Sequence, residues 1–484
     1  MKTSSPERTF SSRKLRSEHQ AYWFGRYNVN AMLLMSGLGE RLKPPKKARK
    51  QLGSLANFDP EKMPANPYLL KAVYAAGDPH FQQAADFSDL STLYWDRESM
   101  DETLEPEAQA LTIQKVTAKG LRTRYHRRGK DRFIALVQLK EAMALATTLR
   151  ERLTTSNGLV ATRTPAGDLA DPQPVQQATA LAAYSSLALS LTDPDLLLYQ
   201  KLPNSREFSA RVRTWADELF AAARTVRPES SKALALTIRA NGWYAVATKD
   251  ADRRRDALGE LDALAQQIHQ RQRSEDLPLT ELAWAVYGLA EASHVTNSTK
   301  YATAARRIFF ERMEARWQPD AGIYTETASG AGQVYTPATA AAVFAAINAV
   351  RFVATPGLGT VGNPRQADKR YVQFFRNAVV ESGLQQAHAI PLAVHPAYQK
   401  EEPKRHFTAE SVPLSAEGHG PHGLCPVYAA EVSYEDDEWT VTNRRFRTAA
   451  AMHLSLLSPT LSATAPDGFI PIDRLRSELA SGSQ

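Results

Sequence analysis

The feature that most constrains the fold of this chain is an alternation, from about residue 133 onward, between two kinds of predicted helix. Segment 206–225 represents the first kind, because Phe208, Val212 and Leu219 share one stripe while Arg and acidic residues occupy the rest of the surface. That spacing predicts a helix with one buried face and one face in water. The same pattern recurs in three later segments, 258–268, 301–313 and 371–379.

The second kind of segment is almost free of charge. Residues 174–192 and 337–350 contain no Asp, Glu, Lys or Arg, and residues 233–248 contain only Arg239. Residues 281–293 and 448–457 are similarly rich in Ala and Leu, which favour helix formation. A helix that is apolar all round is expected to be buried all round.

A closed double ring explains this alternation, with uncharged helices inside and amphipathic helices outside. The inner segments begin near residues 175, 231, 279, 336 and 445, a spacing too uneven for an open array of tetratricopeptide or HEAT repeats. Five outer and inner pairs can be assigned, and a sixth would have to come from residues 66–120. The assigned pairs are 133–192, 206–248, 252–294, 298–353 and 366–457.

This pattern of helices resembles the six-hairpin (α/α) toroids found among glycoside hydrolases, polysaccharide lyases, sugar epimerases and terpenoid cyclases. The resemblance implies an all-α fold, an (α/α) toroid of five to six helical hairpins, with a binding site at one mouth of the ring. It is a resemblance of helix pattern alone, and no family signature accompanies it. No catalytic residue is therefore transferred to this chain.

Charge is concentrated at the amino-terminal end. The chain has 484 residues and a formal charge of +7, but residues 1–50 hold twelve Lys or Arg against three Glu, a local charge of +9, so the other 434 residues sum to −2. The charge and Pro content of this segment predict a basic, largely irregular extension over residues 1–65, peripheral to a toroid domain over residues 66–484. No aromatic residues interleave with its basic run as in nucleic-acid binding proteins.

Other features of the whole sequence indicate the cellular compartment of the protein. There is no secretory signal pattern and no run of about 20 apolar residues that would predict a transmembrane segment. The single cysteine, Cys425, excludes an intrachain disulfide and suits a reducing compartment. These features predict a cytoplasmic protein, and they leave its oligomeric state unknown.

Two long connections enter inner helices, over residues 316–336 and 383–444, so the face at the amino-terminal ends of those helices is the candidate working face. The second connection, with the helix that follows it, carries six of the eleven histidines. We expect it to end in a small β-hairpin around Glu435-Asp-Asp437. His453, in the last inner helix, is expected to be a hydrogen-bonded core residue. The six histidines are His388, His395, His406, His419, His422 and His453.

The densest part of this insertion reads His-x-x-His-x-x-Cys. Its short spacings would let His419, His422 and Cys425, with His388, approach one Zn or Cu ion. The alternative is a Gly- and Pro-rich surface turn whose histidines bond to the backbone. We expect His419 and His422 to be the closest pair, because one Gly-Pro link joins them.

The first long connection combines rings, carboxylates and glycines, the mixture that a sugar site needs. The candidate catalytic acids are Asp320, Glu326 and Glu410, although each can also be a turn or capping residue. Glu281 has a simple interpretation as a helix-dipole partner, and Arg239 is then its ion-pair partner or part of an anion site. The candidate substrate-binding residues are Trp317, Tyr324, Tyr335 and Arg239.

Three functions therefore remain open. The first is an enzyme acting on a carbohydrate or related polar small molecule or oligosaccharide at the mouth of the ring. The second is a metal-binding or redox-linked protein that uses the His/Cys insertion. The third is a scaffold without catalytic activity that holds a partner at the same mouth. Metal content of the purified protein would distinguish the second function from the other two.

Overall fold

The computed structural model describes residues 6–62, 69–79, 90–118, 129–193, 196–272, 277–326, 333–353, 363–386 and 428–459. Its elements are α1 Pro6–Asn30, η1 Ala31–Met35, β1 Gly39–Leu42, α2 Lys46–Ala56, η2 Pro60–Lys62, β2 Leu69–Val73, β3 Ala76–Gly77, η3 Leu90–Leu93, η4 Arg97–Ser99, α3 Pro106–Thr117, α5 Gly129–Arg152, α6 Pro174–Thr192, α7 Leu197–Gln200, α8 Ser205–Ala223, α9 Ser231–Ala247, α10 Ala251–Arg271, α11 Leu279–Thr296, α12 Thr299–Arg307, η5 Ile308–Met313, η6 Glu314–Arg316, β4 Trp317–Gln318, β5 Ile323–Tyr324, β6 Gln333–Tyr335, α13 Pro337–Val353, α14 Pro364–Phe374, η7 Phe375–Glu381, β7 Glu431–Glu435, β8 Glu438–Asn443, β9 Phe446–Arg447 and α15 Thr448–Leu457.

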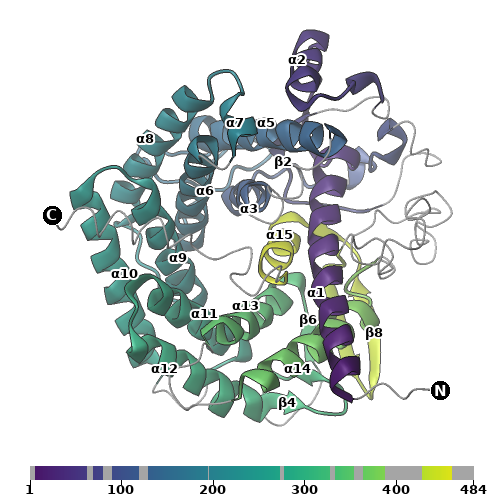
Figure 1. Ribbon diagram of the computed structural model, residues 1–484, viewed down its shortest axis with the longest axis vertical. Coiled ribbons are helices and arrows are strands. Elements are labelled where there is room, and N and C mark those ends of the chain that lie inside the picture. Colours follow the sequence, from purple (N-terminus) through teal and green to yellow (C-terminus); the bar gives the residue numbers. More distant parts are fainter. Residues whose placement is uncertain are drawn as a thin grey trace.

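Within these residues, six helices form a closed inner ring. In chain order α3, α6, α9, α11, α13 and α15 each pack against the next, and α15 packs back against α3 (Figure 1). Residues 177–191 of α6 and 340–350 of α13 are buried without interruption. The prediction that the uncharged segments lie inside a closed ring is confirmed, and the chain is an all-α (α/α) toroid.

The outer layer consists of amphipathic helices. Phe208, Val212 and Leu219 of α8 are buried against α6, as their stripe predicted. Helix α10 buries Leu261 and Ile268 on its inner face and packs against α9 and α11. Five of the outer helices around the ring are α5, α8, α10, α12 with η5, and α14 with η7.

The sixth outer helix corrects the expectation of an irregular, peripheral extension over residues 1–65. Residues 6–30 form α1, which lies against α14 and α15 and completes the outer layer (Figure 1). Phe24 is fully buried with its ring 5.8 Å from that of Phe375, and Asn28 Nδ2 donates to Ser455 Oγ over 3.1 Å. Apolar residues spaced along 21–34 therefore outweigh the basic composition of this segment. The sixth hairpin is α1 with α3, so only its inner helix comes from residues 66–120.

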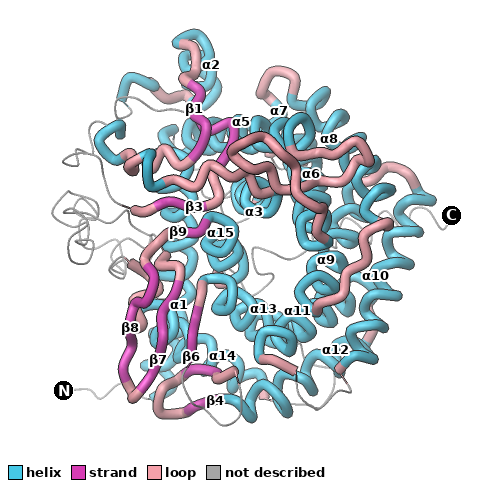
Figure 2. Tube along the Cα trace, turned by 180° about the vertical axis from the view of Figure 1, so that it is seen from behind, coloured by secondary structure: helices cyan, strands magenta, loops and turns pink. Residues whose placement is uncertain are grey.

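The strands are short and lie toward the same side of the ring as α1 (Figure 2). The predicted hairpin around Glu435-Asp-Asp437 is confirmed, because β7 and β8 pair antiparallel across it and β6 adds a third strand. Asp436 and Asp437 both have positive φ, 49° and 64°, as a tight two-residue hairpin turn requires. Strand β9 then leads directly into α15.

Within the described ranges, no helix has the length and apolar character that crossing a bilayer requires.

Candidate functional site

The ends of the inner helices bring charged side chains together across the ring. Glu107 lies in the first turn of α3, Lys232 is the second residue of α9, and His453 belongs to α15. Glu107 Oε1 lies 2.9 Å from Lys232 Nζ and 2.6 Å from His453 Nε2. With Glu105, the residue before α3, these side chains form what we call the axial cluster. Because α3, α9 and α15 are far apart in the chain, only closure of the ring assembles it.

A second contact joins helices α3 and α9 deeper in the ring. Arg239 donates from its guanidinium to Gln114 Oε1, and each residue lies seven positions beyond its counterpart in the Lys232–Glu107 pair. Seven residues advance a helix by two turns, roughly 10 Å. Helices α3 and α9 therefore face each other in register, and the amino-terminal ends of both lie at one mouth.

The amino-terminal end of α11 lies at the same mouth. Glu281, in its first turn, accepts a 2.9 Å hydrogen bond from the backbone N–H of Ser231, the first residue of α9. Arg239 is 3% exposed, and burial raises the pKa of the neighbouring Glu291 carboxyl to about 7, although the charge of Arg239 acts to lower it. The structure thus pairs Glu281 with the backbone of α9 and sets Arg239 beside Glu291.

The surroundings of the two carboxyls in the axial cluster shift their pKa values in opposite directions. Burial acts to raise the pKa of Glu107, but the charge of Lys232 and the hydrogen bond from His453 outweigh it and hold the pKa well below the ordinary value. Burial and the neighbouring charges of Glu107 and Asp101 raise the pKa of Glu105 to about 7. One carboxyl is therefore ionised at neutral pH, and the other exchanges its proton there.

The side chains of the axial cluster differ in how far they are exposed to solvent. The side chains of Lys232 and Glu107 are 32% and 19% exposed, whereas His453 is 2% exposed and its ring packs edge-on against Trp284. Burial lowers the pKa of His453, although the hydrogen bond to Glu107 partly offsets this. Since Glu107 is ionised and accepts, the neutral imidazole carries its proton on Nε2. His453 therefore positions Glu107 from the buried side, which confirms the prediction of a hydrogen-bonded core histidine.

Two of the three acids predicted from sequence lie elsewhere. Asp320 is exposed in the turn between β4 and β5. Glu326 Oε1 accepts a 3.1 Å hydrogen bond from the backbone N–H of Leu279, the first residue of α11, which is a capping contact. Glu410 lies outside the described residues. Their catalytic roles remain predictions.

The three aromatic residues predicted to bind substrate share one buried cluster. Trp317 packs edge-on against Tyr324 at 4.8 Å and lies under the guanidinium of Arg370. The hydroxyl of Tyr324 donates to Glu314 over 2.8 Å, and that of Tyr335 donates to the carbonyl of Tyr324. The exposed fractions of Trp317, Tyr324 and Tyr335 are 7%, 0% and 0%, so the rings are part of the core, and their role in substrate binding stays a prediction.

The predicted metal ligands His388, His419, His422 and Cys425 lie outside the described residues. Among the residues that the structure does describe, no group of three or more His, Cys, Asp or Glu side chains is arranged to hold a metal ion. Zn or Cu binding stays a prediction.

Sequence reasoning found His453 but missed Glu105, Glu107 and Lys232. Glu105-Pro-Glu107 stands at the start of a helix, where acidic residues are common for reasons of the helix dipole alone. Lys232 directly precedes the almost uncharged segment 233–248, where a charged side chain is equally ordinary. A usable signal was the pairing of an isolated charge at the start of one inner segment with an opposite charge at the start of another.

Comparison with known proteins gives structural neighbours without sequence relatives. No family model and no curated protein matches the sequence. The structure is similar to a D-mannose isomerase, with 12% identity, a TM-score of 0.48, and coverage of 86% of this chain and 98% of the other. A sugar epimerase from a ruminal bacterium has 10% identity, a TM-score of 0.46, and coverage of 81% and 93%. A cellulase of C. cellulolyticum has 10% identity, a TM-score of 0.43, and coverage of 80% and 86%.

Proposed function

We propose that this protein is an enzyme that performs general acid–base catalysis on a carbohydrate or a related polar substrate at the axial cluster. The observation that carries the proposal is the pair of carboxyls, Glu105 and Glu107, whose pKa values are driven in opposite directions. Such pairs separate the roles of proton donor and ionised partner within one site. Perturbed carboxyls at a mouth lined by charged groups are typical of catalytic sites.

Each member has a role in this proposal. Glu105, with a pKa of about 7, donates and accepts the proton that moves during the reaction. Glu107 stays ionised and stabilises positive charge that develops on the substrate. Lys232, partly exposed, binds a substrate hydroxyl or carbonyl oxygen through its ammonium group. His453 is a positioning residue, since it acts through Glu107.

The substrate class follows from the donors and acceptors at the mouth. Carboxylates and an ammonium group need hydrogen-bonding partners once a substrate displaces water, and a polyhydroxylated molecule supplies many in a small volume. The exposed groups carry both signs of charge, so a neutral polar substrate fits better than a multiply charged one.

The experiment is a substrate screen under two readouts. Aldoses and ketoses are incubated with the enzyme in D2O, and exchange at the carbon beside the carbonyl is followed by NMR. Aryl glycosides are tested in parallel for release of the aromatic alcohol. We expect turnover in one assay that is lost in Glu105→Gln and preserved in Glu102→Gln, a neighbouring exposed carboxylate paired with Arg97. Turnover that survives Glu105→Gln would overturn the proposal.

A further inference from the structure

Four lysines at the start of α2 take no part in the contacts that hold the fold. Lys43 follows β1, while Lys46, Lys47 and Lys50 belong to α2, and the side chains of all four are exposed. In the described part of the chain, none of the four forms a hydrogen bond or an ion pair. We call this set the lysine patch.

The lysine patch belongs to a helix that is fixed on the body of the protein. Leu52 and Ala56 are buried where α2 packs against α5. At 100° of rotation per residue, the three lysines within α2 fall in an arc of about 100° on the side away from those two residues. The basic run predicted to lie in an irregular extension is therefore a defined surface of the folded protein.

Folding alone does not favour this placement of lysines. The first turn of α2 holds no acidic residue, although the amino-terminal end of a helix is the positive end of its dipole. Lys50 lies three positions after Lys47 and four after Lys46, so like charges are neighbours on the helix surface and destabilise it. A negatively charged partner would offset both effects.

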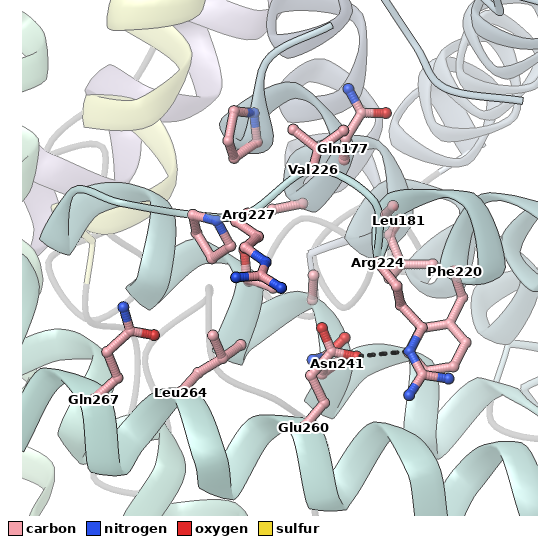
Figure 3. A pocket seen from close by; sticks show the side chains of 16 residues that line it. Gln177, Leu181, Phe220, Arg224, Val226, Arg227, Asn241, Glu260, Leu264 and Gln267 are labelled. Atoms are coloured by element: carbon pink, nitrogen blue, oxygen red, sulfur yellow. Dashed lines mark ion pairs between the residues drawn. The ribbon is translucent and has the colours of Figure 1, made fainter. Parts of the chain in front are cut away.

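Cations on other outer helices are matched by carboxylates. In the pocket between α8, α9 and α10 (Figure 3), Arg224 is ion-paired with Glu260, with 3.9 Å between Nε and Oε2. Arg253 of α10 is similarly paired with Asp217 of α8 over 3.1 Å. The lysine patch differs from these sites, because no carboxylate among the described residues lies within ion-pair distance of it.

The residue types at the patch favour a lipid surface over a nucleic acid. Nucleic acids are bound largely through arginine forks and stacked aromatic rings. The two nearby arginines are used within the protein, since Arg49 donates to the carbonyl of Pro60 over 3.1 Å and Arg41 lies 4.7 Å from the ring of Tyr94. The exposed side of α2 carries no aromatic residue. Lysine is a compact charge that suits the diffuse negative potential of an anionic bilayer.

An exposed apolar side chain adjoins the lysines. Leu42, the last residue of β1, is 50% exposed and directly precedes Lys43. Segments that lie on a membrane combine cations, which meet the lipid headgroups, with apolar side chains that enter the boundary with the acyl chains. Leu42 and the lysine patch supply both components at one place.

The position of α2 makes this surface accessible. Figures 1 and 2 both show α2 projecting outward from the ring, beyond α5. The axial cluster, in contrast, is formed by the inner helices α3, α9 and α15. A bilayer that meets α2 therefore contacts the rim of the ring.

We infer that the lysine patch and Leu42 form a docking surface for a bilayer that contains anionic lipids. The inference is independent of the proposed function, because none of these residues belongs to the axial cluster. Binding through a few lysines and one apolar side chain is reversible. It also depends on ionic strength, because salt screens exposed charges.

The test is co-sedimentation of the full-length protein with vesicles of two compositions, phosphatidylcholine alone and phosphatidylcholine with an equal part of phosphatidylglycerol. We expect the protein to bind only the anionic vesicles. Raising the salt concentration from about 0.1 M to about 1 M shortens the Debye length from about 10 Å to about 3 Å and should weaken this binding at least about tenfold.

Reversing the charge of the patch should abolish binding to the anionic vesicles. The variant combines Lys46→Glu, Lys47→Glu and Lys50→Glu. It should fold at least as stably as the wild type, because acidic residues suit the first turn of a helix better than lysines do, and thermal unfolding checks this. If it fails to fold, the combination of Lys46→Gln, Lys47→Gln and Lys50→Gln takes its place and should lose most of the binding.

A matched control separates the patch from net charge. Lys249→Glu, Lys300→Glu and Lys369→Glu together change the net charge by the same amount at exposed positions on other elements, and this variant should retain binding. Leu42→Gln should weaken binding by a smaller factor, about three- to tenfold.

Several results would overturn the inference. They are equal binding to vesicles without anionic lipid, no vesicle binding, binding that survives charge reversal of the patch, and an equal loss in the control variant. A DNA duplex is measured in parallel. Tighter binding to the duplex than to the vesicles, abolished by the same three substitutions, would assign the patch to nucleic acid instead.

Discussion

His453 Nε2 lies 2.6 Å from Glu107 Oε1, which links the last inner helix of the ring to the first across 346 positions of sequence. The contact holds a carboxylate of the axial cluster in place and also joins α15 to α3, where the ring closes. Folding of the toroid and assembly of the proposed active site are therefore coupled through this pair. Changes to either residue should affect both properties.

Replacing His453 with Phe should separate these effects. The substitution removes the hydrogen bond that helps to lower the pKa of Glu107, so that pKa should rise. A carboxyl with a depressed pKa stabilises the fold at neutral pH and loses this contribution as pH falls. The variant should therefore be about 1 to 3 kcal/mol less stable at pH 7, and acid should reduce its stability less than that of the wild type. Urea unfolding at several pH values measures this, and His453→Gln, which keeps a donor, should recover part of the loss.

Glu105 should show the opposite dependence on pH. Its pKa is raised to about 7, so the folded state holds the proton more tightly than the unfolded state between about pH 4.5 and pH 7. Stability contributed by this group is present at low pH and is lost as pH rises toward 7. Glu105→Gln should consequently stabilise the protein at pH 8 by roughly 1 to 3 kcal/mol, with little change at pH 4. Equal effects at the two pH values would contradict the assignment.

Removal of residues 1–30 should destroy the ring. Helix α1 is the sixth outer helix, and its loss would expose apolar surface on α14 and α15. Lys14 also forms a 2.7 Å ion pair with Asp368, which bonds in turn to Arg351 of α13. Circular dichroism and size-exclusion chromatography of the truncated chain should show an unfolded or aggregated protein. A compact, helical product would show that α1 is dispensable.

Much of the fold was predictable, because the presence or absence of charged residues in a helix decides whether one face or the whole helix can be buried. Residues 174–192 lack charge and form α6 with those bounds, and the turn Glu435-Asp-Asp437 forms the predicted hairpin. The role of residues 6–30 was not predictable, because their basic residues conceal the apolar stripe that packs on helices from the other end of the chain.

The axial cluster was less accessible to sequence reasoning. Glu107 and Lys232 are 125 positions apart, and each has an ordinary explanation at the start of a helix. Their relationship depends on the register of α3 against α9, which is a property of the closed ring. Loop composition instead favours Asp320 and Glu326, whose neighbours depend on how the connection between β4 and α13 folds against α11.

Glu326 should prove to be a structural residue. Glu326→Ala removes the acceptor for the first backbone N–H of α11, and loss of such a cap costs about 0.5 to 2 kcal/mol. Activity per folded molecule should stay unchanged, and Asp320→Asn, in an exposed turn, should change neither property. Thermal unfolding and turnover of the two variants are the relevant measurements. A large loss of turnover with intact stability would return these acids to the catalytic role predicted from sequence.

The most direct test of catalysis at the axial cluster is the pH dependence of kcat/KM for the wild type and Glu105→Gln, measured with the substrate that the two-assay screen identifies. We expect a limb in the wild-type profile near pH 7, the value to which burial and neighbouring carboxylates raise the pKa of Glu105. Glu105→Gln should lose that limb together with roughly 100- to 10,000-fold of activity, while Glu102→Gln retains both. A wild-type profile that is flat through pH 7, or a Glu105→Gln enzyme that keeps its activity, would contradict the claim that the axial cluster is the catalytic site.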